Sequence, residues 1–149
     1  MEPLNKNKLS TAKLFILAGL LLLAIGMLFG LTGALQYLIT DFIKQYLSFE
    51  KVRPLHVSSV VFWIIFAAIG SVLTYLQQYN GKVIFSPLLL KIQFAIFSIS
   101  VFAILVSYCF GVFGGREYWE FHPVFALPIA AGWILFIINF IKSLSSFKN

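Results

Sequence analysis

Charged residues are scarce in this chain of 149 residues, because they make up 11% of it, whereas an average soluble domain has about 25%. Cysteine is scarcer still, since Cys109 is the only one. A single cysteine excludes an intrachain disulfide and any zinc or iron–sulfur site built from several cysteines. Apolar side chains instead account for 60% of the residues and give a mean hydropathy of +0.95. A water-soluble fold of this size could not bury so much apolar surface, so the composition indicates a protein of the lipid bilayer and excludes a soluble enzyme or nucleic-acid-binding domain.

Four apolar runs are each long enough to cross the hydrocarbon core, which takes about 20 helical residues. They predict membrane helices at about 14–39, 54–79, 87–114 and 123–141. Strands of a membrane barrel are excluded, because the runs lack the required alternation of apolar and polar residues. The first run is also longer than the apolar part of a signal peptide, so we expect it to be a membrane helix. The predicted fold is therefore all-α, with residues 1–149 forming one transmembrane domain, an integral membrane four-helix bundle.

The positions of lysine and arginine predict the orientation of this bundle. Four spans place both termini and the loop near residue 82 on one side of the membrane. That side carries most of the basic residues against Glu2 alone: Lys6, Lys8, Lys13, Lys82, Lys91, Lys142 and Lys148. The other side has mixed charge: Lys44, Lys51, Arg53 and Arg116 with Asp41, Glu50, Glu117 and Glu120. Because loops rich in lysine and arginine stay in the cytoplasm, both termini are predicted to be cytoplasmic.

Three shorter features complete the organisation of the chain. The connector at about 41–50 has apolar residues spaced among polar ones, which favours a short helix lying in the membrane interface. Gly26 and Gly30 form a G-x-x-x-G pair, a spacing that lets membrane helices approach closely. The polar, lysine-bearing end at 142–149 is compatible with a natural C-terminus.

The chain has two histidines, and the first, His56, lies one turn into the second predicted helix. A stripe of mostly small residues follows it at helical spacings of three and four: Ser59, Val60, Trp63, Ala67, Gly70, Ser71 and Thr74. Such a stripe could leave a groove for a flat macrocycle, with its iron bound by His56 and its propionates reaching Arg53. The alternative is a histidine hydrogen-bonded at the level of the lipid headgroups, with the small residues packed against another helix.

A second group of candidate residues lies between the third and fourth predicted helices. Glu117 and Glu120 would share a face of a short helix, where they could hold a hard cation such as calcium or relay protons. The alternative is a solvated loop whose Trp119 belongs to the aromatic belt of the membrane. His122 precedes Pro123 at roughly the depth of His56, so it could be a second axial ligand or could simply meet water.

Two of these segments together resemble the catalytic subunit of C-family (cbb-type) haem-copper cytochrome oxidases and of the related nitric oxide reductases. VRPLHVSSVVFW at 52–63 resembles the start of the second helix of that subunit. GGREYWEFHP at 114–123 resembles the stretch before its fourth helix, where an E-Y-x-E pattern recurs. The resemblance covers essentially the whole chain but only the N-terminal part of a typical family member.

The resemblance implies roles for particular residues. His56 would be an axial ligand of the low-spin haem b, and Arg53 would pair with the haem propionates. Glu117 would match the carboxylate near a calcium ion that bridges the propionates, and Glu120 would be its neighbour in a polar cluster that could conduct protons. His122 matches no functional residue of the family.

The resemblance also implies a function. We expect a haem-b-binding subunit of a respiratory electron-transfer complex in the bacterial inner membrane, like the N-terminal part of a cytochrome c oxidase or nitric oxide reductase main subunit. Such a chain is not catalytic alone, because other membrane subunits must supply the remaining haem and copper ligands. The alternative is a haem-free accessory or assembly subunit. A transporter is disfavoured, because no charged residue lies at the middle of a predicted span.

Overall fold

Four helices make up most of the computed structural model, which describes residues 10–80, 84–114, 116 and 119–145. They are α1 (Thr11–Leu38), α2 (Phe49–Asn80), α3 (Pro87–Cys109) and α4 (Ala126–Ser145), and the short 3₁₀ helix η1 (Pro123–Phe125) precedes α4. Each of the four spans is long and apolar enough to cross a membrane. The prediction of an all-α integral membrane protein is therefore confirmed.

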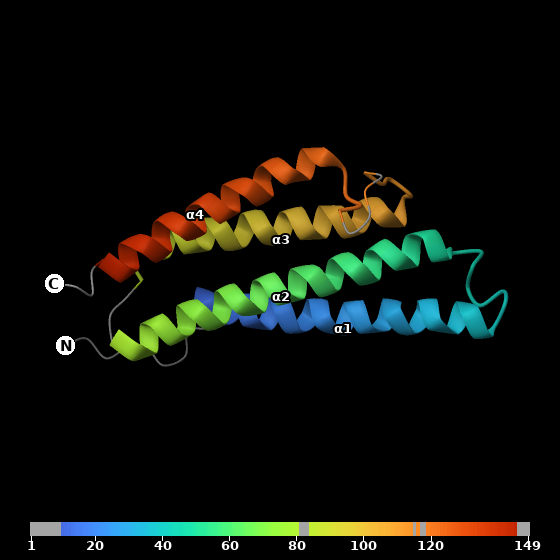
Figure 1. The fold of residues 1–149 in the computed structure, drawn as a ribbon, viewed down its shortest axis with the longest axis horizontal. Coiled ribbons are helices and arrows are strands. Elements are labelled where there is room, and N and C mark those ends of the chain that lie inside the picture. Colours follow the sequence, from blue (N-terminus) through green and yellow to red (C-terminus); the bar gives the residue numbers. More distant parts are fainter. Residues whose placement is uncertain (1–9, 81–83, 115, 117–118, 146–149) are drawn as a thin grey trace.

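The four helices are arranged as two hairpins that lie side by side (Figure 1). Helix α1 packs mainly against α2, and α3 packs mainly against α4. The start of α1 and the end of α4 lie at one end of the molecule, while the connector after α1 and the loop after α3 lie at the other (Figure 1). We call this second end the loop end. That the opposite end faces the cytoplasm stays a prediction.

Helices α1 and α2 approach closely because each presents glycine to the other. A Cβ atom added to Gly26 in α1 would lie 2.9 Å from the Val60 Cγ2 atom in α2. A Cβ added to Gly70 in α2 would lie 2.8 Å from the carbonyl oxygen of Ala12 in α1. The G-x-x-x-G spacing thus contributes to helix packing, as such spacings commonly do.

This packing shows what lies against the small-residue stripe on α2. Ser59 is fully buried, and a Cβ on Gly19 of α1 would lie 3.1 Å from the Ala67 nitrogen and 3.3 Å from the Trp63 carbonyl oxygen. Helix α1 therefore occupies the groove that was considered for a macrocycle. The small residues pack against another helix, as the alternative expected.

A column of aromatic rings joins all four helices. Phe15 of α1 lies 5.4 Å from Phe66 of α2, measured between ring centroids, and Phe66 lies 6.0 Å from Phe97 of α3. Phe97 in turn lies 5.9 Å from Trp133 of α4 in an edge-to-face arrangement. Such pairs contribute about 0.5–1.5 kcal/mol each beyond the area they bury. The column fixes how the second hairpin lies on the first.

The connector between α1 and α2 is not the interfacial helix that its sequence pattern predicted. Residues 39–48 form a series of turns. Ile43 has a φ of +46°, in the left-handed region that an L-residue cannot adopt within a right-handed helix. The side-chain Nε2 of Gln36 donates to the carbonyl oxygen of Leu47 at 2.8 Å and holds the connector against the end of α1.

Helix α2 begins at Phe49, ahead of the predicted start at residue 54. Pro54 therefore lies inside the helix, where it cannot donate a hydrogen bond to the carbonyl of Glu50. The additional turn carries Lys51, whose Nζ donates to the carbonyl oxygen of Cys109 at 2.9 Å. A lysine there satisfies an open carbonyl at the end of α3 and offsets the negative end of its dipole. The start of α2 is thereby tied to the second hairpin at the loop end.

Candidate functional site

The imidazole of His56 lies between α2 and α1 and is half-buried. Its Nδ1 atom is 2.7 Å from the carbonyl oxygen of Gly26. The ring also rests on Gly30, where an added Cβ would lie 2.9 Å from both the Cε1 and Nδ1 atoms. The two glycines of the G-x-x-x-G pair therefore orient the imidazole, one by its carbonyl and the other by its missing side chain.

This hydrogen bond sets the protonation of the neutral ring. A carbonyl oxygen can only accept, so Nδ1 must carry the proton and donate it to Gly26. The other ring nitrogen, Nε2, then keeps its lone pair. Histidines that bind metals in proteins are oriented in the same way, with one nitrogen donating to a carbonyl and the other binding the metal. The arrangement is chemically suited to a ligand of iron.

Arg53 lies one turn before His56 and forms an ion pair with Glu120 through its Nη2 atom. Because Arg53 belongs to α2 and Glu120 to the loop between α3 and η1, the pair joins the two hairpins. The side chain of Arg53 is 47% exposed and that of Glu120 is 12% exposed. This cation therefore lies at the surface of the loop end, close to the histidine in sequence and on the same helix.

Of the two glutamates predicted as calcium ligands, Glu120 lies within the described residues. Glu120 uses Oε1 for Arg53, while its Oε2 atom is buried and has no hydrogen-bond partner within the described residues. Glu117 lies outside the described residues. In the described part of the chain, no group of three or more His, Cys, Asp or Glu side chains lies close enough together to hold a metal ion.

His122 has a structural task at the start of η1. Its Nδ1 atom accepts a hydrogen bond from the backbone nitrogen of Val124 at 3.3 Å, so the side chain acts as an N-cap. The residue is exposed. Whereas His56 is fixed by α1, His122 is fixed by its own loop, and among the described hydrogen bonds the two imidazoles share no partner.

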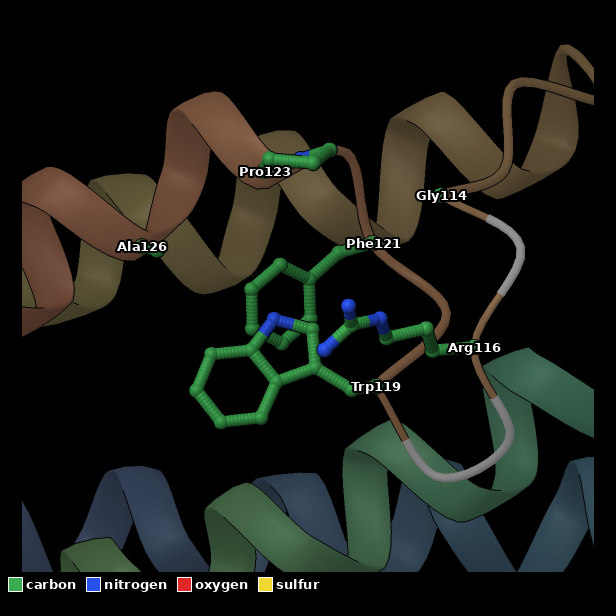
Figure 2. Close-up of a pocket in the computed structure, with 6 residues that line it drawn as sticks. All are labelled: Gly114, Arg116, Trp119, Phe121, Pro123 and Ala126. Atoms are coloured by element: carbon green, nitrogen blue, oxygen red, sulfur yellow. The ribbon is translucent and has the colours of Figure 1, made fainter.

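Sequence reasoning missed the partners of these residues. The pair at Gly26 and Gly30 is visible in the sequence, but its spacing indicates only close packing and does not identify His56 as the side chain that it receives. The Arg53–Glu120 pair spans 67 positions, so no local pattern could reveal it. The pocket lined by Arg116, Trp119 and Phe121 (Figure 2) was equally hidden.

Comparison with known proteins relates this chain to a family of membrane oxidases. Residues 10–149 match the family described as "Cytochrome C and Quinol oxidase polypeptide I". The chain is also 28% identical over 101 residues to a nitric oxide reductase subunit of Stutzerimonas stutzeri. That alignment covers 68% of this chain and 21% of the relative, so the chain spans only a small part of the relative's length.

Proposed function

Because this chain belongs to the cytochrome c and quinol oxidase polypeptide I family, we propose that it is the haem-b-binding part of a haem-copper oxidase or nitric oxide reductase type of subunit. His56 would hold the haem through its iron, and the haem would supply one-electron transfer within a membrane complex. The protein works in the bacterial inner membrane with both termini in the cytoplasm, as the distribution of lysine and arginine indicates.

The hydrogen bond from His56 Nδ1 to the Gly26 carbonyl supports this proposal most directly. It leaves Nε2 as the nitrogen that binds iron and restrains the ring against rotation. Since α1 fills the groove along α2, a haem held by His56 has to lie outside the α1–α2 contact. Because His122 is exposed and already caps η1, a second ligand of the haem would come from outside these 149 residues.

Arg53 is the proposed partner of the haem propionates. An arginine has five N–H donors in a planar fork that matches carboxylates. Glu120 holds the guanidinium at the loop end through Nη2, one turn of helix from His56. Propionates at the water boundary would meet a cation whose position is already fixed on α2.

A calcium ion does not fit the described residues. Calcium takes about 6–8 oxygen ligands, whereas Glu120 is already paired with Arg53 and lies in no described group of three or more metal-binding side chains. These 149 residues also contain only two histidines, too few for a haem centre together with a copper site of several imidazoles, so reduction of oxygen or nitric oxide would require ligands from outside them.

The visible absorption spectrum of the purified full-length chain tests the proposal. The reduced protein, co-expressed with the other subunits of its complex, should show the sharp α-band of a low-spin haem, and His56→Ala should abolish it. His122→Ala is the matched control, because it removes the other imidazole and should leave the band in place.

Two outcomes would contradict this assignment. A colourless wild-type preparation, even after co-expression, would favour the haem-free accessory subunit. Loss of the band in His122→Ala as well as in His56→Ala would indicate a bis-histidine site within one chain instead of a ligand from a partner.

A further inference from the structure

Two cavities at the loop end share a wall. The first has a volume of about 340 Å³ and lies beside the loop between α3 and η1, where Arg116, Trp119 and Phe121 line it together with Pro123 and Ala126 (Figure 2). The second has a volume of about 150 Å³ and is also lined by Trp119 and Phe121. The two spaces therefore lie against the same two aromatic rings.

The second cavity extends from the shared rings between the two hairpins. Val61 and Ile65 of α2 line one side, and Ile129 and Trp133 of α4 line the other. The hydroxyl of Ser58, which also lines it, already shares a hydrogen bond with the hydroxyl of Tyr108 at 3.1 Å. This space offers dispersion contacts to an apolar chain and offers little to a polar ligand.

The first cavity differs from the second because a cation contributes to its lining. Among the described residues that line the two cavities, Arg116 alone is charged. Figure 2 shows its guanidinium beside the rings of Trp119 and Phe121. Trp119 is 52% exposed and lies at the end of the spans, at the level where tryptophan marks the boundary between lipid and water. The two cavities together thus offer one cation and a mostly apolar lining.

We propose that this combined site binds one anionic phospholipid, with its phosphate on Arg116 and one acyl chain between α2 and α4. A guanidinium pairs with phosphate through two parallel hydrogen bonds, and the apolar cavity between α2 and α4 shares Trp119 and Phe121 with the cavity that Arg116 lines. The site is separate from the haem proposal, because Ser58 and Ile65 lie on the face of α2 that looks toward α4, whereas His56 contacts α1.

Quenching of tryptophan fluorescence by brominated lipids tests this site. The full chain carrying Trp63→Phe keeps only Trp119 and Trp133, both of which line the cavity between α2 and α4. In mixed micelles, acyl-brominated phosphatidylglycerol should bind about fivefold more tightly than brominated phosphatidylcholine, since one basic residue near anionic lipid contributes about that factor. Arg116→Gln should remove the preference, and Arg116→Lys should retain most of it.

Lys44→Gln is the matched control, because it removes a cation from the connector at the same end and should leave the preference unchanged. Ile129→Phe fills the apolar cavity and should reduce quenching by both lipids. Equal quenching by the two lipids in the parent protein, or an undiminished preference in Arg116→Gln, would overturn the proposal. Displacement of the brominated lipid by inorganic phosphate at equal concentration would also overturn it, because the site would then recognise a bare anion.

Discussion

At the residue scale, the imidazole of His56 depends on the absence of a side chain at Gly30. The ring lies where a Cβ would come within 2.9 Å of Nδ1 and Cε1. Gly30→Ala should therefore displace the ring and break its 2.7 Å hydrogen bond to Gly26. We expect the reduced haem band of the co-expressed complex to shift or disappear, while overpacking costs about 1–3 kcal/mol of stability.

Gly33→Ala is the control for this substitution. It adds the same methyl group one turn along α1, but the nearest atom to it is Val52 Cγ1 at an ordinary 3.4 Å. The haem spectrum of this variant should match that of the unmodified protein. If Gly30→Ala also left the spectrum unchanged, the orientation of His56 by α1 would have no bearing on ligation.

At the scale of single elements, Asn139 of α4 holds the start of α3 in place. Its side chain is 1% exposed, accepts from the Ser86 nitrogen at 3.0 Å and donates to the Ser86 carbonyl at 3.1 Å. Asn139→Leu would leave the Ser86 N–H without its acceptor, at a cost of about 1–3 kcal/mol. The expected result is a lower Tm, with faster amide exchange in the first turn of α3.

The exposed Ser145 provides the comparison for Asn139. Its hydroxyl donates to the carbonyl of Lys142 within the last turn of α4, so Ser145→Ala should leave the Tm nearly unchanged. An equal fall in Tm for both variants would mean that the contact between Asn139 and Ser86 stabilises the protein no more than the exposed hydrogen bond of Ser145 does.

The elements themselves follow from the sequence wherever hydrophobic length decides them. Four apolar runs are enough to predict four spans, because a membrane helix needs little more than about 20 apolar residues. The prediction of a helix in the connector was wrong, because an amphipathic pattern does not indicate the left-handed φ at Ile43. The start of α2 was placed at Pro54 because a proline favours a first turn, whereas the preceding Phe49 to Arg53 also adopt helical geometry.

At the scale of the whole molecule, the Arg53–Glu120 ion pair joins the two hairpins. A double-mutant cycle of Arg53→Gln and Glu120→Gln should give a coupling energy of about 0.2–1 kcal/mol in the unfolding of the purified protein. Because Arg53 is half exposed, this energy should fall as the salt concentration rises. Additive effects of the two substitutions at low salt would contradict the contact. Lys44→Gln combined with Glu120→Gln should be additive.

The candidate site shows the same limit of sequence reasoning at this larger scale. His56 was identified as a candidate ligand because it is a rare imidazole near the end of a membrane helix. The small-residue stripe on α2 packs against α1, which is distant in sequence. Packing by α1 could therefore only be named as an alternative. Arg53 and Glu120 were each noted separately, since pairing across 67 positions depends on the arrangement of the hairpins.

Pairing α1 mainly with α2, and α3 mainly with α4, also has a consequence for biosynthesis. Contacts between neighbouring segments form rapidly, and N-terminal segments leave the ribosome first. The first hairpin can thus insert and lock the imidazole onto the Gly26 carbonyl before Glu120 has been translated. The imidazole is thus oriented early, and the Arg53–Glu120 ion pair forms later, once the second hairpin has entered the bilayer.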